Sequence, residues 1–144
     1  MNYKLLEKQD LELMLDFIDD ENTKYTIDEL NDFISNKNNL GFIAIENNRI
    51  IAFSFGYILN HPNGESVFYF DAIDVMKDYQ GKGIGTKLMI YTKNYVKDIG
   101  CKEMFLVTNK SNLSACKCYE KSGGISEATD DVVYVYNFEG DKQW

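Results

Sequence analysis

Gln80-Gly81-Lys82-Gly83-Ile84-Gly85-Thr86 is a glycine-rich run that follows a strand-like segment, residues 67–75, and opens an amphipathic helix. Its three glycines at alternate positions let the backbone turn tightly and bring successive N–H groups close to a ligand. The helix N-terminus adds a partial positive charge, so the run predicts an anion site that suits phosphate. Lys77, Lys82 and Lys87 surround it in a chain that is acidic elsewhere.

Two familiar phosphate-binding motifs do not fit this run. Its glycines are two apart and no Lys-Ser or Lys-Thr pair follows at the Walker spacing, which disfavours a P-loop. A dinucleotide-binding fold would place the run in the first strand-helix unit of a mostly parallel sheet, whereas two hairpin-like strands come first here. A flexible helix entry without a ligand remains the alternative.

The composition indicates a single domain, residues 1–144, with 44% hydrophobic residues to form one core. No segment approaches the roughly 20 apolar residues that cross a bilayer, so we expect no membrane contact and a cytoplasmic protein. Cys101, Cys116 and Cys118 lack CxxC spacing, and His61 is the one histidine, which disfavours a disulfide framework, a metal site and a Ser-His-Asp triad. The formal net charge of -8 argues against nucleic acid and suits a cationic partner.

Hydrophobic periodicity and turn signals predict the order β-α-α-β-β-β-α-β-α-β. Asp10 is expected to cap the first helix, which ends in the acidic patch at 19–21, and Thr26 to cap the second. Asn47-Asn48 suits a tight hairpin turn. The strands are expected at 3–6, 40–46, 50–59, 67–75, 104–107 and 132–138, and the later helices at 84–99 and 112–122. One crossover amid hairpins predicts an α/β (α+β) fold with a mixed, mostly antiparallel central sheet flanked by helices.

Two segments resemble the GNAT superfamily of acetyl-CoA-dependent N-acetyltransferases. Residues 75–85 resemble its strand-to-helix pyrophosphate motif. The second CoA motif is matched by Asn112-Leu113-Ser114-Ala115-Cys116-Lys117-Cys118-Tyr119-Glu120-Lys121-Ser122-Gly123. The resemblance covers about residues 67–138 by motif and implies a GNAT-like fold, acetyl-CoA as cosubstrate and no metal.

The resemblance also implies a set of cofactor contacts. The N–H groups of residues 80–86 are expected to hold the CoA pyrophosphate, and the backbone of residues 73–75 to pair with the pantetheine arm. Asn112 would face the CoA arm and Ala115 would leave room for it, although an N-cap and a packing residue are equally open roles. Gln80 stands where many members have Arg, so a nearby lysine is expected to supply that charge. The expected cofactor-binding residues are Ile73, Asp74, Val75, Gln80, Gly81, Lys82, Gly83, Ile84, Gly85, Thr86, Asn112, Ala115 and Tyr119.

Two side chains are expected to carry the proton transfers. Tyr119 occupies the motif position whose phenol is commonly proposed to protonate the departing thiolate, and its ordinary pKa near ~10 keeps it protonated. Packing on the core face of its helix is the alternative. Strand alternation places Asp71 on one face with Tyr69 and Ile73, where it could accept a proton or hold an ammonium group; a hydrogen-bonded strand residue is equally open. The oxyanion is expected to meet a backbone N–H near Val75.

The acceptor is less well defined. Residues 69–75, 118–121 and 133–138 look most like the branch that contains aminoglycoside 3-N-acetyltransferases, which implies a cationic aminosugar and antibiotic resistance. The acidic strand residue of that branch falls on Ala72, and a shifted register or a moved bulge would be needed to bring Asp71 there. Polyamines, amino acids, and a protein lysine or N-terminus stay open, as do an acetyl-CoA-binding sensor without turnover and a homodimer. An acidic acceptor pocket is expected from Asp19, Asp20, Glu21, Glu127, Asp130 and Asp131.

Overall fold

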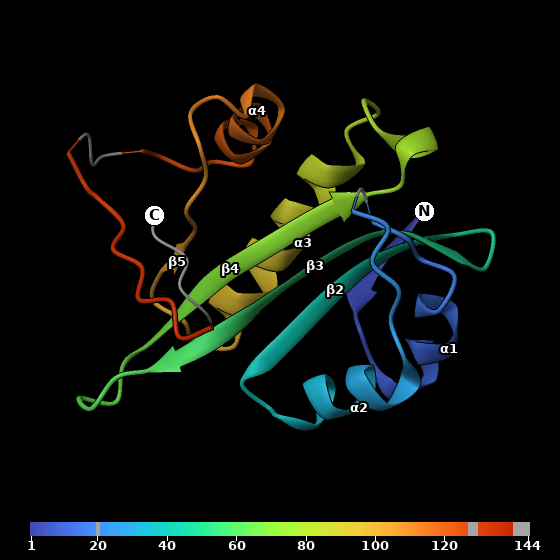
Figure 1. The fold of residues 1–144 in the computed structure, drawn as a ribbon, viewed down its shortest axis with the longest axis horizontal. Coiled ribbons are helices and arrows are strands. Elements are labelled where there is room, and N and C mark those ends of the chain that lie inside the picture. Colours follow the sequence, from blue (N-terminus) through green and yellow to red (C-terminus); the bar gives the residue numbers. More distant parts are fainter. Residues whose placement is uncertain (20, 127–129, 140–144) are drawn as a thin grey trace.

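The computed structural model describes residues 1–19, 21–126 and 130–139. Its centre is a five-stranded sheet in the order β1-β2-β3-β4-β5 (Figure 1). Neighbouring strands are antiparallel except for β4 and β5, which run parallel. This arrangement confirms the predicted mixed, mostly antiparallel sheet. The strands are β1 (Asn2–Leu5), β2 (Asn39–Glu46), β3 (Arg49–Asn60), β4 (Ser66–Val75) and β5 (Met104–Phe105).

Helices cover both faces of the sheet (Figure 1). α1 (Leu11–Met14) and α2 (Ile27–Ser35) pack on one face, here called the α2 face. α3 (Ile84–Asp98) packs on the other, the α3 face, and α4 (Leu113–Lys121) lies beside α3. The helices and the sheet thus form layers around two apolar cores, one on each face.

The two cores fix the register of the strands. Along β2, Phe42 and Ala44 belong to the core beneath α3, whereas Ile43 belongs to the core beneath α1 and α2. This follows from the two-residue repeat of a strand. A slip of one residue would move each set to the wrong face, so the pairing is strongly specified.

A buried polar pair joins α3 to the sheet. Thr92 Oγ1 donates to the carbonyl of Leu88 at 2.9 Å and lies 3.1 Å from Ser54 Oγ of β3. Because the Thr92 proton is already used, Ser54 donates and Thr92 accepts. The pair satisfies both hydroxyls in a region where an unpaired polar group would be destabilising.

Several local signals in the sequence are confirmed. Thr26 caps α2: its Oγ1 accepts the N–H of Glu29 at 3.2 Å and donates to the Glu29 carboxylate at 2.8 Å. Asn47 and Asn48 both have left-handed backbone angles, with φ of 51° and 60°, as a tight hairpin turn between right-twisted strands requires. Each of these features depends on residues close together in the sequence, and each is present in the structure as predicted.

Asp10 is the N-cap residue of α1, as predicted, but its side chain makes no capping hydrogen bond to that helix. Its carboxylate accepts the N–H of Glu7 at 2.9 Å and pairs with Lys4 at 2.8 Å. The reason is a 3₁₀ turn at Lys8–Asp10 that precedes α1 and begins after Glu7, so Asp10 occupies the third position of a capping box. The helical turn therefore starts earlier than the apolar pattern indicates.

The first helix also ends earlier than predicted, at Met14. Carboxylates at Asp16 and Asp19 lie where the negative end of the helix dipole would be, which disfavours continuation. Asp19 Oδ1 instead accepts the N–H groups of Glu21 and Thr23, at 3.0 and 2.8 Å, and so orders a turn.

The final strand predicted at 132–138 is absent: the described segment has no strand assignment and is exposed, with Tyr134 at 81%. Its β-branched and aromatic residues suit a strand, but a strand also needs a neighbouring edge with free hydrogen-bonding groups. β5, the strand at the edge of the sheet, is only two residues long, Met104–Phe105, and offers too little edge for that pairing.

Candidate active site

A bulge in β4 sets the faces of the residues near the site. Gly56 of β3 pairs with Phe70, and Phe55 pairs with Ala72, so the register passes over Asp71. The alternation of side chains reverses at this point. Residues after the bulge therefore lie on the opposite face from the one that uninterrupted alternation predicts.

The reversal corrects the prediction for Asp71. Ile73 lies opposite Ser54 on the α3 face, and Asp74 lies opposite Phe53 on the α2 face. Asp71 does share the α2 face with Tyr69, but it does not share a face with Ile73. One extra residue in the strand is the physical cause, because side-chain orientation has a period of two.

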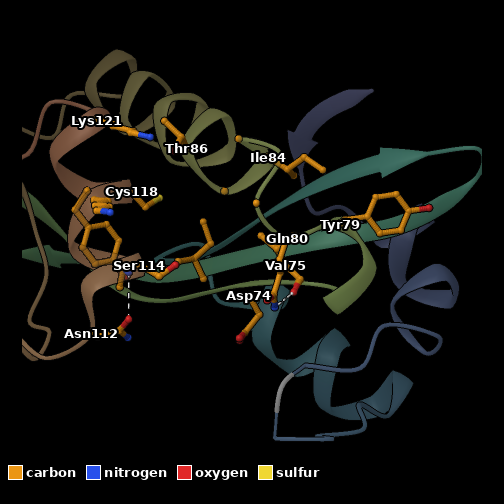
Figure 2. A pocket seen from close by; sticks show the side chains of 17 residues that line it. Asp74, Val75, Tyr79, Gln80, Ile84, Thr86, Asn112, Ser114, Cys118 and Lys121 are labelled. Carbon is orange, nitrogen blue, oxygen red and sulfur yellow. Dashed lines mark hydrogen bonds between the residues drawn. The ribbon is translucent and has the colours of Figure 1, made fainter.

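A cleft of about 610 Å³ opens between the end of β4, the glycine-rich run and α4 (Figure 2). It brings together the two motifs that lie apart in the sequence. Every predicted cofactor residue except Lys82 lines it. The lining residues are Ile73, Asp74, Val75, Tyr79, Gln80, Gly81, Gly83, Ile84, Gly85, Thr86, Asn112, Ser114, Ala115, Lys117, Cys118, Tyr119 and Lys121.

The cleft exists because β4 and β5 diverge. In the described part of the chain their ladder consists of Phe68 with Met104 and Tyr69 with Phe105, and β4 continues to Val75 beyond it. An extended ligand can pair with this free edge as an added strand would.

Backbone direction supports the expected oxyanion contact. The N–H of Met76 points to β3, where it donates to Ile51 at 2.8 Å. Successive N–H groups of a strand point to opposite sides, so that of Val75 points to the cleft. The Val75 carbonyl points the same way and accepts Gln80 Nε2 at 2.9 Å (Figure 2).

The glycine-rich run forms an uncapped helix start. Gly83 is the N-cap of α3, with φ of 80° and no side chain to bond the N–H groups of the first turn. A Cβ on Gly83 would meet nothing within 4 Å, so the left-handed backbone, not lack of space, calls for glycine. The first-turn N–H groups have no partner inside the helix and face the cleft, as an anion site requires.

Among the described residues, the lysines that line the cleft come from α4. Lys117 and Lys121 line it, whereas Lys77 and Lys82 do not. Lys82 Nζ lies 5.5 Å from the centre of the Tyr79 ring, in a cation–π arrangement. The lysine charge near the anion site therefore comes from a different element than the sequence predicts.

Asn112 has the role of an N-cap. Its Oδ1 accepts the N–H of Ala115 at 3.1 Å, and both residues also line the cleft (Figure 2). Cys118 lines it too, but burial raises the pKa of its thiol, the largest effect on that group. A thiol held protonated is a poor nucleophile, which agrees with a packing role.

Tyr119 lies in the cleft and packs edge-on against Phe70, with ring centres 6.2 Å apart. Burial raises the pKa of Tyr119, and Cys118, Cys116 and Asp74 act in the same direction. The phenol therefore stays protonated at neutral pH. Both roles considered from sequence, packing and proton donation, are compatible with this position.

Asp71 is outside the cleft lining and exposed. It lies beside Tyr57, whose pKa is raised first by burial and then by the nearby Asp71. The structure thus places Asp71 on the α2 face, away from Tyr119.

Asp74 is the carboxylate residue that lines the same cleft as Tyr119. It was expected to act through its backbone, yet its half-buried side chain also lines the cleft from the α2 face (Figure 2). Asp74 contributes to the raised pKa of Tyr119. It also adds to the raised pKa of Tyr25, which reaches about 12 mainly through burial and to which Asp19 contributes as well. In the sequence, an acidic residue within an apolar strand indicates a functional carboxylate. Both Asp71 and Asp74 fit that pattern, and the sequence analysis assigns the catalytic role to Asp71.

Of the predicted acidic pocket, Asp19 contributes charge near Tyr25, and Asp130 and Asp131 are exposed. Asp20 and Glu127 lie outside the described residues. Within residues 1–19, 21–126 and 130–139, no group of three or more His, Cys, Asp or Glu side chains could hold a metal ion. No helix in this part of the chain is long and apolar enough to span a membrane.

Residues 7–124 match the family model described as "Acetyltransferase (GNAT) family". N-alpha-acetyltransferase 30 of Schizosaccharomyces pombe is 30% identical over 82 residues, 57% of this chain and 55% of that protein. Streptothricin acetyltransferase A of Bacillus subtilis is 33% identical over 90 residues, 62% of this chain and 49% of that protein. The chain thus spans about half the length of the curated relatives it matches.

Solved structures share the fold at low identity. An aminoglycoside acetyltransferase from an uncultured soil metagenomic sample, in complex with sisomicin, superposes with a TM-score of 0.77 at 21% identity over 94% of each chain. Aminoglycoside N-acetyltransferase AAC(6')-Iy in complex with CoA gives 0.71 at 18% identity, over 95% of this chain and 94% of that one. At these identities the likeness concerns the fold alone.

Proposed function

Since the chain belongs to the acetyltransferase (GNAT) family, we propose that it transfers the acetyl group of acetyl-CoA to a primary amine by direct attack on the thioester. One observation carries the proposal: a single cleft joins an uncapped helix N-terminus, a free strand edge and a protonated tyrosine. These are the parts needed to bind a phosphate-bearing thioester and to protonate its sulfur.

The cleft fits acetyl-CoA by its chemistry. The N–H groups at the start of α3 suit the pyrophosphate, and Lys117 and Lys121 add positive charge on the facing helix. The free edge of β4 at Ile73 and Val75 suits the amide groups of the pantetheine arm. When bound, acetyl-CoA supplies an electrophilic carbonyl and a thiolate leaving group.

The protein supplies three roles around that carbonyl. The N–H of Val75 donates to the oxygen that becomes negative. Tyr119 donates its phenolic proton to the sulfur as the C–S bond breaks, and its raised pKa keeps that proton available. Asp74 accepts the proton that the amine loses as the new C–N bond forms.

We assign this last role to Asp74 in place of Asp71. Asp74 lines the cleft and contributes to the raised pKa of Tyr119, whereas Asp71 is outside the lining and lies beside Tyr57. The Asp74 side chain comes from the α2 face, so the amine would approach from that face and meet the thioester where β4 and β5 diverge.

The proposed acceptor is a cationic small molecule, with an aminoglycoside as the first candidate. Support comes from the net charge of -8 and from carboxylates of Asp71 and Asp74 on the face of approach. An enzyme of this kind would act in the cytoplasm and contribute to antibiotic resistance. The N-terminal amine of a protein is the second candidate, because one relative is an N-alpha-acetyltransferase that is 30% identical over 82 residues.

An acceptor screen tests the proposal. The protein is mixed with acetyl-CoA and with aminoglycosides, polyamines or peptides that have free N-termini, and released CoA thiol is measured. We expect turnover with the cationic small molecules and little with peptides. Binding of acetyl-CoA without turnover across the panel would instead identify a sensor, and turnover confined to peptides would favour the second candidate.

A further inference from the structure

A row of aromatic rings crosses the α2 face of the sheet. Tyr57 of β3 and Tyr69 of β4 stack with ring centres 6.4 Å apart and planes within 19° of each other. Tyr69 continues to Phe105 of β5 at 5.2 Å. Tyr57, Tyr69 and Phe105 are here called the aromatic strip.

α2 covers one end of this row. Phe33 of α2 packs edge-on against Phe55 and Tyr57, at 5.9 and 6.2 Å. Phe105, at the other end, is 39% exposed, and Tyr57 and Tyr69 are half-buried. The strip therefore begins under a helix and opens to solvent toward the sheet edge.

Asp71 lies beside the strip with its carboxylate in solvent. It is exposed and close enough to Tyr57 to raise the pKa of that phenol, and its oxygens can accept hydrogen bonds from a ligand. The ion pairs of the described residues, Lys4 with Glu7 and Asp10 and Lys102 with Glu65, do not include it. The chain thus places a negative charge on an aromatic surface with no lysine paired to it among these residues.

The bulge in β4 places the Asp71 carboxylate on the same face as that of Asp74, which lines the cleft. Asp71 and Asp74 are three residues apart, so a regular strand would direct them to opposite faces. The bulge at Asp71 brings both carboxylates to the α2 face. At about 3.3 Å per residue they are separated by up to about 10 Å along β4.

We propose that Asp71 and the aromatic strip form a subsite for a second ammonium group of the acceptor. This rests on the proposed function, in which Asp74 receives the reacting amine. The substrate class is then a dication with two ammonium groups up to about 10 Å apart. The carboxylate supplies the opposite charge, and the faces of Tyr57 and Tyr69 attract a cation and pack against its carbon skeleton.

A pair of matched acceptors tests the subsite. One is a straight-chain diamine with nitrogens about 10 Å apart, and the other is the amino alcohol of equal length, which lacks the second charge. Acetyl transfer is measured at low ionic strength because exposed charges are screened by salt. We expect kcat/KM about tenfold higher for the diamine, the scale of one exposed ion pair plus one cation–π contact.

Two variants locate the effect. Asp71→Asn should remove the preference by lowering kcat/KM for the diamine alone. Asp98→Asn, at an exposed aspartate on α3, makes the same change in net charge and should keep the preference. An equal loss for both acceptors in Asp71→Asn, or a wild-type protein without preference, overturns the subsite.

A binding measurement separates this inference from the proposed function. Calorimetry with the diamine and the protein alone should show tighter binding to wild type than to Asp71→Asn. That result without any acetyl transfer would reject the proposed function and keep the subsite. Equal binding to the two proteins overturns the subsite, whether or not acetyl transfer occurs.

Discussion

Replacing Gly83 by alanine tests whether the start of α3 holds the cofactor phosphates. Gly83 has φ of 80°, and an added Cβ would meet no atom within 4 Å. The substitution therefore adds backbone strain without a steric clash, about 1–2 kcal/mol for a left-handed non-glycine residue. For a chain of this size that corresponds to a melting temperature lower by roughly 2–8 °C.

Gly64→Ala is the matched control. Gly64 has φ of 86° in the turn between β3 and β4, and a Cβ there also meets no atom within 4 Å. The two variants should lose similar stability. They differ in place, because Gly64 is not among the residues that line the cleft.

The expected difference is in CoA binding. In Gly83→Ala, any part of the 1–2 kcal/mol that the free protein escapes by relaxing the run does not lower its stability. Binding must then restore the left-handed turn, so that part appears as a lower CoA affinity, by up to roughly 5–30-fold. Isothermal calorimetry with CoA measures it. Two outcomes would refute a phosphate cradle at this helix start. One is unchanged affinity in a Gly83→Ala protein that melts nearer to wild type than Gly64→Ala does, and the other is an equal loss of affinity in Gly64→Ala.

Three further predictions concern the cleft. Tyr119→Phe keeps the ring against Phe70 and should lower kcat by roughly 10²-fold while the CoA dissociation constant stays unchanged; an unaltered single-turnover rate would remove Tyr119 as the acid. Because the pKa of Tyr119 is raised, its phenol should stay protonated beyond pH 10.0, and Asp74→Asn should move the alkaline fall in rate to lower pH; an alkaline fall at unchanged pH would argue against an electrostatic effect of Asp74 on Tyr119. Lys121→Gln should weaken CoA binding about 3–10-fold at low salt, as expected for one charge near a phosphate, whereas Lys82→Gln, outside the lining, should have little effect; equal losses would contradict the assignment of charge to α4.

Burial of tyrosines also predicts a limit to alkaline stability. The pKa of Tyr25 is raised to about 12, so the folded state holds this proton more tightly than the unfolded chain does. The stabilisation is complete below the ordinary value near 10.0 and is lost as the pH rises toward about 12.

Local features of the fold were predictable from the sequence. Thr26 and Asn112 cap helices, and Asn47 and Asn48 make a hairpin turn, because each contact joins residues within four positions of one another. The role of the Asp10 side chain was missed for a related reason: a 3₁₀ turn precedes α1, and Asp10 fits the capping pattern of either.

Some parts of the candidate site were also predictable from the sequence, and others were not. The glycine-rich run and the α4 motif were found from sequence as two separate phosphate and CoA signals, and the fold joins them in one cleft. The lysines of that cleft, Lys117 and Lys121, were not singled out. Lysine is common on exposed helices, so no local signal separates these two from Lys77 and Lys82.

The sequence by itself determined the helix entry at Gly83, the caps, the hairpins and the family resemblance, since backbone conformation and short-range hydrogen bonds depend on near neighbours. The tertiary structure decided which carboxylate residue lines the cleft with Tyr119. Pairing with β3 accommodates one extra residue at Asp71, and this reverses the faces of all later β4 residues. Asp74 therefore lies on the α2 face, the same face as Asp71. Such a register is a property of two strands together, and neither strand's sequence states it alone.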